Sequence, residues 1–306
     1  MKRENHGVRV LLTILLATLA LGLAVVVLAA ADVGPFGGDE EGSGPVPAGE
    51  RKRVDRFDSA RAWRLLREQV ELGPRPAGSA KSRALARRLH RMVPRGRYQK
   101  VPGGLRNVIG TVPGREPRSV VVVGAHYDTK DIPGFVGAND GASGTAVVAQ
   151  IARSLRPRTI RPTVVFIFFD GEESPAGTPD SKFRQKGLRG SKVAARTYSR
   201  AEAMILLDFV GERNLSIPRE EFSDSALWSR LRAAARAVGR EQTFPSQTRS
   251  GIFDDHVPFS DVGVPSIDLI DFYFPCFHET CDDLSEVSED SLDATGETVV
   301  ELLRRL

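Results

Sequence analysis

The pattern of apolar residues divides the chain into short buried strands and amphipathic helices. Runs of apolar, largely β-branched residues without polar alternation are typical of strands that are buried on both faces. Besides a shorter strand at residues 107–112, we expect four such strands, at residues 119–124, 163–169, 203–207 and 264–270. Apolar residues at helical spacing predict helices at residues 59–71, 79–92, 144–155, 189–198, 225–238 and 288–303.

Strands that alternate with helices predict an α/β fold. The expected architecture has three layers, helix/sheet/helix, with a mostly parallel central sheet that is covered on both faces. A chain of 306 residues is long enough for one large domain of this class, because folded chains of this size bury roughly three quarters of their extended surface. We expect this single domain to occupy residues 57–306, beginning near Phe57.

The N-terminal part of the chain predicts a membrane anchor. Residues 10–31 are 22 apolar or small residues without a charge, and a helix needs about 20 to span a bilayer. Lys2, Arg3 and Arg9 precede them, so residues 1–9 are expected to be a cytoplasmic tail. The protein would then be a single-pass protein of the cell membrane, with its folded domain outside the cytoplasm.

A second interpretation of this apolar run stays open. Residues 29–31 are three alanines that could serve as the cleavage site of a signal peptide, in which case the protein is secreted. Residues 32–56 follow and begin with many Gly, Pro and acidic residues, a composition that is typical of a flexible linker. Both interpretations export the folded domain.

The charge balance gives no sign of a nucleic-acid partner. The chain has 43 Lys and Arg residues against 39 Asp and Glu, which is a net charge of +4. Most basic residues are interleaved with acids, and no stripe combining basic and aromatic residues stands out, so we expect no nucleic acid to bind. Two cysteines allow at most one disulfide, which excludes a scaffold built on disulfides.

Polar residues of a similar kind follow the predicted strands. Because the carboxyl ends of parallel strands form the binding crevice of an open α/β sheet, these residues are expected to meet at one edge. Each alone is more often a helix cap or a surface charge, but five separate segments repeat the pattern. The residues are His126, Asp128, Asp140, Asp170, Glu172, Glu173, Asp208 and His278.

Imidazole and carboxylate groups in this number predict a divalent cation. Zinc binds His nitrogen and Asp or Glu oxygen, and a catalytic zinc keeps one position open for water. Two ions can share one carboxylate and hold a nucleophile and a substrate oxygen between them. Glu172, next to a ligand at Glu173, is then a candidate general base or acid.

Six strings of the chain occur in the order of a known family: AHYDT, GANDGASG, FDGEES, LLDFVG, DDHVPFSDVGVP and HETCDD. Together they resemble family twenty-eight of the metallopeptidases, the zinc-dependent aminopeptidases, and their relatives the animal-type glutaminyl cyclases. The resemblance extends from about Phe57 to the C-terminus. It implies a zinc exopeptidase-like fold for the catalytic domain.

Carried over by position, the resemblance implies the ligands of two zinc ions. His126, Asp140 and Asp208 match the ligands of one ion. Asp140, Glu173 and His278 match those of the other ion, with Asp140 bridging the two. All five ligand positions are filled, which implies a functional metal centre.

The same resemblance implies roles for residues around the metals. Glu172 matches the acid/base, and Asp128 matches a carboxylate that orients the first His ligand. Asp254 and His256 match positions of a polar network beside the cyclase zinc, although capping of their own loop explains them equally well. Phe277 stands where the cyclases carry a Trp that lines the substrate pocket.

The resemblance implies an enzyme that acts on peptide or protein N-termini. The main hypothesis is an aminopeptidase that hydrolyses the first peptide bond with a metal-activated water, two zinc ions and Glu172 as general base and acid. The alternative is a glutaminyl-peptide cyclotransferase with one zinc ion, which forms N-terminal pyroglutamate. DDHVPF is cyclase-like, whereas Phe277 and Thr178 replace two cyclase tryptophans. A noncatalytic binding ectodomain is a remote third hypothesis.

Two cysteines, Cys276 and Cys281, flank His278. Outside the cytoplasm they could form a short disulfide that stiffens this ligand loop, and the resemblance implies a comparable bridge in related aminopeptidases. Two free buried thiols are the alternative. A structural zinc on both cysteines and His278 is a weaker hypothesis, because a fourth ligand is missing.

Overall fold

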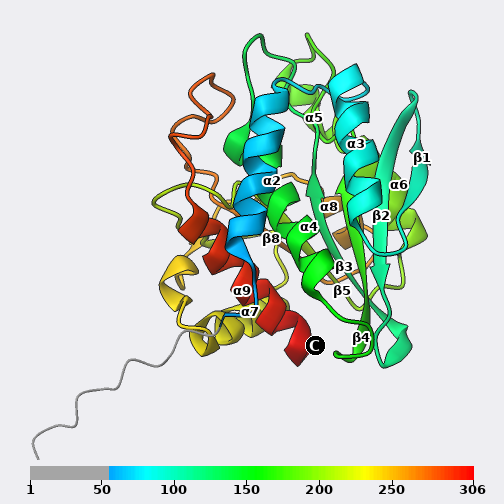
Figure 1. Cartoon of the computed structure of the whole chain (residues 1–306), viewed down its shortest axis with the longest axis vertical. Helices are drawn as coiled ribbons and strands as arrows, with labels where there is room; N and C mark the ends of the chain where they lie inside the picture. The colour runs from blue at the N-terminus through cyan, green and yellow to red at the C-terminus, as the bar shows by residue number, and fades with distance from the viewer. Residues whose placement is uncertain (1–54) are drawn as a thin grey trace, which may run out of the picture. The chain divides into compact units, whose positions relative to one another are not determined.

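The centre of the fold is a six-stranded sheet. The computed structural model describes residues 55–306, and the structural statements that follow concern these residues. The strands are β1 (Arg97–Val101), β2 (Leu105–Val112), β3 (Glu116–His126), β4 (Pro162–Phe169), β5 (Ala203–Asp208) and β8 (Ser266–Ile270). Their spatial order is β1-β2-β4-β3-β5-β8 (Figure 1). β4, β3, β5 and β8 are parallel neighbours, whereas β2 pairs antiparallel with β4 and with β1, which confirms the mostly parallel sheet.

Alternate residues of the central strands contribute to two hydrophobic cores, one on each face of the sheet. In β4, Val164, Phe166 and Phe168 belong to the larger core. Val165 and Ile167, which lie between them, belong to the smaller core. All five side chains are buried, so the strand needs apolar residues at every position and shows no polar alternation.

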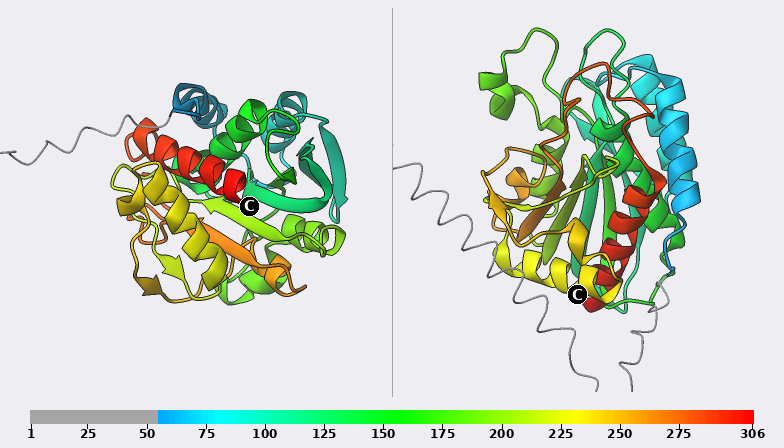
Figure 2. Two further views of the ribbon diagram at one scale, coloured as in Figure 1. Left: turned by 90° about the horizontal axis from the view of Figure 1, so that it is seen from below. Right: turned by 90° about the vertical axis from the view of Figure 1, so that its left-hand side faces the viewer.

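Helices cover both faces of the sheet, as the three-layer prediction expects (Figures 1 and 2). The larger core is covered by α2 (Ser59–Leu72), α3 (Ala80–Met92), α4 (Gly144–Ser154), α7 (Ser225–Ala237) and α9 (Glu289–Arg305). The smaller core is covered by α6 (Arg189–Thr197) and α8 (Val257–Ser260). The short elements are η1 (Ala138–Ser143), η2 (Asp180–Lys182), α5 (Phe183–Lys186), β6 (Arg219–Glu220), η3 (Glu241–Thr243) and β7 (Thr248–Arg249).

Polar side chains define where several helices begin. Asp58, Ser79, Asp224 and Ser288 each accept a hydrogen bond from the backbone N–H three residues further on. A side-chain oxygen at this position satisfies one of the N–H groups that have no partner inside the helix. The long helices therefore start within one residue of the predicted positions.

The pattern of apolar residues does not predict two local features of the fold, β1 and η1. β1 is an edge strand with mostly exposed side chains and one buried residue, Val101, so it lacks the apolar run of a central strand. η1 is a π-helical turn whose backbone angles are non-helical at Asp140 and Gly141. A glycine-rich string has no hydrophobic period from which such a turn could be predicted.

The first described residues contact α9, the last helix of the chain. Phe57 is buried in the larger core, and its N–H donates to the carboxylate of Glu297 in α9. Residues Lys52–Leu306 form one compact unit that contains both cores, so we expect it to fold without the preceding residues.

The predicted cytoplasmic tail, apolar run and most of the linker lie outside the described residues. Among residues 55–306, no helix combines the length and the apolar character that crossing a bilayer requires.

The close packing of α4 on β5 can be tested with Gly144→Ala. A Cβ at Gly144 would lie 2.1 Å from the carbonyl oxygen of Leu207, so the helix would have to move away from the strand. We expect the free energy of unfolding in urea to fall by about 1–3 kcal/mol. Ser154→Ala, at the exposed end of the same helix, is the control and should change it by less than about 0.5 kcal/mol. Equal stability of the two variants would contradict this packing.

Candidate metal centre

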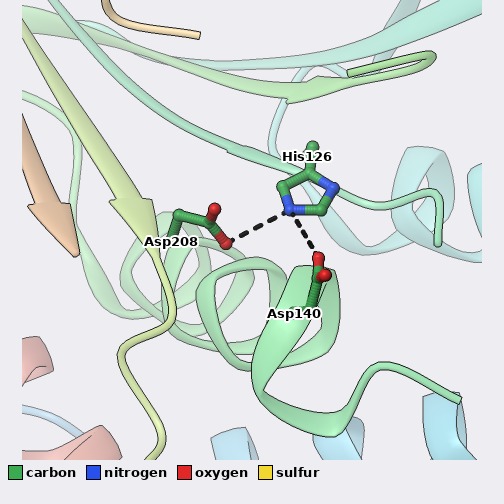
Figure 3. A group of neighbouring side chains, drawn as sticks. All are labelled: His126, Asp140 and Asp208. Atoms are coloured by element: carbon green, nitrogen blue, oxygen red, sulfur yellow. Dashed lines mark hydrogen bonds and ion pairs between the residues drawn. The ribbon is translucent and has the colours of Figure 1, made fainter. Parts of the chain in front are cut away.

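Three side chains from distant parts of the chain meet beyond the carboxyl ends of β3 and β5 (Figure 3). His126 ends β3, Asp208 ends β5, and Asp140 lies in η1. His126 Nε2 is 3.3 Å from Asp140 Oδ1 and 3.2 Å from Asp208 Oδ1. All three residues are buried, and one ligand atom from each lies within 4.8 Å of the other two. They form a first group of ligand atoms around one point.

A second group of ligand atoms uses Asp140 again. Asp140 Oδ2 is 3.6 Å from His278 Nε2, and the same nitrogen is 3.4 Å from Glu173 Oε1. The side chain of His278 is 24% exposed, so solvent reaches this second group from the His278 side. The structure thus brings together the five residues that were expected to bind zinc, as two groups of three with one shared carboxylate.

The donor atoms of both groups suit zinc. Imidazole nitrogen and carboxylate oxygen are common zinc ligands in proteins. Among residues 55–306, the buried Oδ2 of Asp140 has no hydrogen-bond partner. An unsatisfied buried carboxylate oxygen is costly, and a cation between Glu173 and His278 would satisfy it.

The shared ligand, Asp140, is positioned through its backbone. The carboxylate of Asp282 accepts the N–H groups of Asn139 and Asp140, at 2.7 and 3.0 Å. The buried guanidinium of Arg75 donates to the carbonyl oxygen of Gly137 at 3.0 Å. Gly137 has φ = 54°, a left-handed conformation that glycine adopts at little cost. Two distant segments therefore hold the turn that presents Asp140.

Neither of these supporting residues, Arg75 and Asp282, was predicted from the sequence. Asp282 lies inside the HETCDD string, which was available as a signal. Arg75 is one arginine of many in this part of the chain, and only the fold shows that it is fully buried. Burial lowers the pKa of Arg75 to about 10 against the opposing effect of Asp140 and Asp282.

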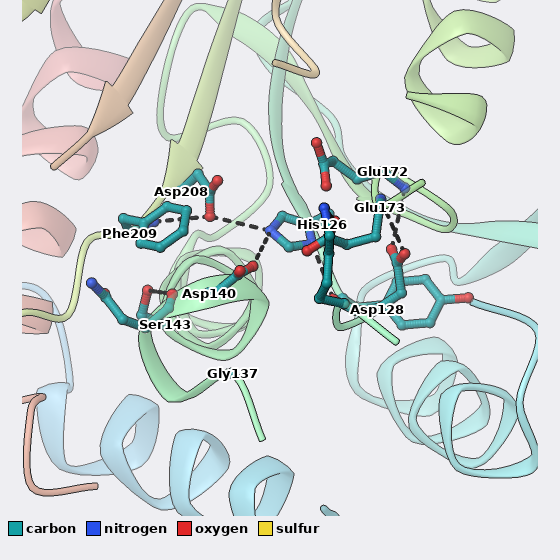
Figure 4. Close-up of polar contacts among 12 residues, drawn as sticks. His126, Asp128, Gly137, Asp140, Ser143, Glu172, Glu173, Asp208 and Phe209 are labelled. Carbon is teal, nitrogen blue, oxygen red and sulfur yellow. Dashed lines mark hydrogen bonds and ion pairs between the residues drawn. The ribbon is translucent and has the colours of Figure 1, made fainter. Parts of the chain in front are cut away.

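Asp128 differs from the expectation that its carboxylate orients His126. His126 Nδ1 lies 3.1 Å from the main-chain carbonyl oxygen of Asp128 instead. The carboxylate accepts the N–H groups of Gly171, Glu172 and Glu173, at 2.9, 3.3 and 3.3 Å (Figure 4). The His126 ring folds back onto its own chain, which leaves the Asp128 carboxylate free to hold the loop that carries the two glutamates.

Burial perturbs the pKa values of the ionisable groups in this part of the molecule. Burial raises the pKa of Glu172 well above its usual value, and the Glu173 carboxylate raises it further. Burial also raises the pKa values of Asp128 and Asp208 to about 7. Burial alone would lower the pKa of His126, but Asp208 beside it raises this pKa well above its ordinary value. The common cause is burial, and neighbouring carboxylates add to it; a divalent cation would offset both effects by favouring the ionised carboxylates.

A cavity of about 390 Å³ opens beside both groups of ligands. Glu172 and Asp254 line it together with four of the ligand residues, Asp140, Glu173, Asp208 and His278. Lys130 also lines it, with Nζ 3.2 Å from Glu173 Oε2. Lys130 was not predicted from the sequence, although it directly follows the AHYDT string. The apolar lining consists of Phe183, Phe209, Ile252, Phe253, Ile270, Phe272 and Phe277.

Asp254 and His256 enter a buried polar cluster next to this cavity. His256 Nε2 is 3.4 Å from Glu220 Oε1, and its Nδ1 is 3.6 Å from Asp268 Oδ2. Asp254 Oδ1 accepts the N–H of Asp255 at 2.5 Å, so it also caps its own loop. Each of the two expected roles therefore applies to one residue. His256 belongs to a polar network, and Asp254 caps its own loop.

A disulfide joins Cys276 to Cys281 across the loop that carries His278. No free cysteine remains, so free thiols and a cysteine-bound zinc do not describe this structure. His278 has φ = 55°, a left-handed conformation that is uncommon outside glycine. Phe277 stacks on its imidazole with 3.8 Å between the ring centroids. The covalent ring and this stacking restrict the position of His278.

Comparison with known proteins gives one family and two kinds of relative. Residues 107–303 match the model of Peptidase family M28. Aminopeptidase YwaD of Bacillus subtilis (strain 168) is 28% identical over 214 residues, which cover 63% of this chain and 43% of YwaD. The glutaminyl-peptide cyclotransferase of Bothrops jararaca is 32% identical over 230 residues, which cover 61% of this chain and 60% of that protein. The chain thus spans about half the length of these curated relatives.

Solved structures of both kinds share the fold. A leucine aminopeptidase precursor from Bacteroides thetaiotaomicron VPI-5482 superimposes with a TM-score of 0.72 at 26% identity, covering 83% of this chain and 99% of that chain. Porphyromonas gingivalis glutaminyl cyclase superimposes with a TM-score of 0.70 at 29% identity, covering 82% of this chain and 99% of that chain. A Zn-dependent exopeptidase from Parabacteroides distasonis ATCC 8503 gives 0.73 at 26% identity, covering 83% and 100%.

The shared position of Asp140 predicts how metal binding responds to substitution. Asp140→Asn should weaken zinc binding at both groups, whereas His126→Ala and His278→Ala should each weaken binding at one. Each loss should exceed the roughly 10–100-fold that removal of a supporting contact costs. Competition titration with a chromophoric chelator measures the affinities. His90→Ala, a residue in neither group, is the control. Unaltered zinc binding by Asp140→Asn would rule out a shared ligand.

Proposed function

Because the chain belongs to peptidase family M28, whose members are zinc-dependent enzymes, we propose that it is an aminopeptidase that hydrolyses the first peptide bond of peptides or proteins. The observation that carries this proposal is the pair of complete ligand groups that share Asp140, with Glu172 in the same cavity. His126, Asp140 and Asp208 would hold one zinc ion, and Asp140, Glu173 and His278 the other. Bound there, zinc would polarise the scissile carbonyl and make water acidic enough to lose a proton near neutral pH.

Glu172 would be the general base and then the general acid. Its carboxylate lines the cavity but belongs to neither ligand group. Its raised pKa makes this carboxylate a stronger proton acceptor than an ordinary glutamate. Glu172 would take a proton from the attacking water and give it to the leaving amine, as a C–O bond replaces the C–N bond. The backbone contact with Asp128 keeps Glu172 in place.

The cavity suits a free N-terminus with an apolar first side chain. The carboxylates of Glu172, Asp208 and Asp254 would attract the positive α-ammonium group. Among the aliphatic and aromatic lining residues, Ile252 and Ile270 would contact an apolar side chain. We therefore expect Leu-peptides to be better substrates than Asp- or Glu-peptides.

A second candidate is a glutaminyl-peptide cyclotransferase. In this reaction the α-amine of an N-terminal Gln attacks its own side-chain amide carbon, and ammonia leaves. Glu172 would carry the proton from the amine to the departing ammonia, and one zinc ion would suffice. The closer sequence identity of the cyclase relative supports this candidate. So does Asp254 from the cyclase-like DDHVPF string, whose charge raises the pKa of Glu172.

We also propose that the domain works outside the cytoplasm, tethered by residues 10–31. The uncharged run of 22 residues supports the tether. The disulfide between Cys276 and Cys281 supports an oxidising compartment, because such bonds are rare in the cytosol. A secreted protein cleaved after the apolar run would satisfy the same observations.

The two reactions can be separated by one assay of the full chain in detergent micelles with zinc. Leu-peptides and Gln-peptides are incubated with the protein, and the products are identified by mass spectrometry. We expect free leucine and a shortened peptide. Pyroglutamyl-peptide and ammonia without free amino acids would instead establish the cyclase. No product from either substrate, with zinc bound, would favour the noncatalytic ectodomain.

The role of Glu172 can be tested with Glu172→Gln. The amide cannot accept the proton of water, so kcat/KM should fall by about 10²–10⁴-fold. Zinc content should not change, because Glu172 is in neither ligand group. Glu116→Gln, at the opposite end of β3, is the matched control and should retain full activity. A Glu172→Gln variant as active as this control would exclude the residue as acid/base.

A further inference from the structure

One stretch of the chain departs from the overall charge balance. Residues 72–115 contain eleven Lys and Arg residues and neither Asp nor Glu. Since the whole chain has a net charge of +4, the other 262 residues together carry −7. The expected interleaving of basic and acidic residues therefore fails here. Arg75 is buried behind Asp140, and the other ten cations lie on α3, β1, β2 and the adjoining loops.

Five of these cations are exposed and have no partner. Among residues 55–306, their side chains make no hydrogen bond or ion pair. They are Lys81, Arg87, Arg91, Arg95 and Lys100. Elsewhere on the surface, arginines are commonly paired; Arg161, for example, contacts Glu116 and Glu202. We call the exposed part of α3, β1 and the loop between them, which carries these five unpaired cations, the basic face.

The helix and strand that carry the basic face adjoin each other (Figure 1). The His90 ring of α3 stacks on the Tyr98 ring of β1, with 4.5 Å between the centroids. The guanidinium of Arg106 lies 5.6 Å from the same Tyr98 ring. Tyr98 is 39% exposed, so an aromatic side chain reaches solvent among the cations.

We propose that the basic face docks on a bilayer that contains anionic phospholipid. Each Lys or Arg close to such a surface strengthens binding about fivefold. Tyrosine is enriched at the level of lipid headgroups, because its ring is apolar and its hydroxyl is polar. Exposed unpaired cations on α3 and β1, together with the partly exposed Tyr98 of β1, match this surface in both charge and polarity.

The sequence also favours a membrane over a nucleic acid as the occupant. Residues 32–54, which are 23 residues, separate the predicted membrane span from the described domain. Even a fully extended chain of this length reaches no further than about 80 Å. If residues 10–31 span a bilayer, this tether keeps the domain within reach of lipid, whereas no feature of the sequence predicts a nucleic acid beside it.

Docking in this way leaves the metal centre accessible. No residue of the stretch 72–115 lines the cavity beside Glu172. The proposal is therefore independent of which reaction the enzyme catalyses. It does depend on the prediction that residues 10–31 anchor the chain.

Vesicle sedimentation tests the proposal directly. The compact unit Lys52–Leu306, whose fold is checked by circular dichroism, is mixed with vesicles of phosphatidylcholine alone or with 30% phosphatidylglycerol. We expect salt-sensitive binding to the anionic vesicles only. The triple variant Arg87→Glu, Arg91→Glu, Lys100→Glu should bind at least about 100-fold more weakly. The matched control, Arg230→Glu, Arg236→Glu, Arg304→Glu, has the same net charge but alters α7 and α9 (Figure 2).

Several results would overturn the proposal. Equal binding to both kinds of vesicle would show that anionic lipid is not recognised. Equal losses of vesicle binding in the two triple variants would show that net charge, and not the basic face, determines the binding. A short DNA duplex that binds the unit at salt concentrations that release it from vesicles would assign the basic face to nucleic acid.

The full chain in nanodiscs provides a second measurement. Trypsin cleavage after Arg95, in the exposed loop between α3 and β1, should be slower in nanodiscs with phosphatidylglycerol than in phosphatidylcholine nanodiscs. Cleavage after Lys182, which is exposed and lies outside the basic face, should proceed equally in both and is the control. Equal rates after Arg95 would contradict docking through this face.

Discussion

The structure depends on how several carboxylates are accommodated out of water at one edge of the sheet. Asp140, Glu173 and Asp208 are buried beside Glu172, and each ionised group raises the cost of ionising the next. Lys130 forms an ion pair with Glu173, and the guanidinium of Arg75 donates to backbone carbonyl groups. A divalent cation is the simplest means of compensating this charge, which is why the geometry of the ligands and the chemistry of the family agree.

The fold positions these carboxylates mainly by holding the backbone of the loops that carry them. The Asp128 carboxylate holds the N–H groups of the glutamate loop, and Asp282 holds those of the turn that carries Asp140. The disulfide closes the loop around His278. Ligands placed by rigid backbone need little reorganisation when a cation or a substrate binds. Asp128, Asp282 and the disulfide therefore contribute to the site although they belong to neither ligand group.

The same arrangement suits two reactions on peptide N-termini. Both need a polarised carbonyl, a group that moves one proton, and negative charge near the α-amine. They differ in the nucleophile, which is water in hydrolysis and the substrate's own amine in cyclisation. Under these proposals the distinction would lie in the number of cations and in the shape of the apolar wall near Phe277, rather than in the identity of the ligands.

Sequence alone predicted the long helices and the buried central strands, because strands buried on both faces need uninterrupted apolar runs. It also predicted that the polar residues after these strands converge on one edge, and the family resemblance selected the five that the fold brings together as two groups. It could not show β1, since an edge strand carries polar side chains. It placed the Asp128 carboxylate against His126, whereas the folded chain turns the imidazole toward the Asp128 carbonyl. The burial of Arg75, the contact of Lys130 with Glu173 and the gathering of unpaired cations on α3 and β1 were decided only by tertiary structure, because they arise from segments that meet in space.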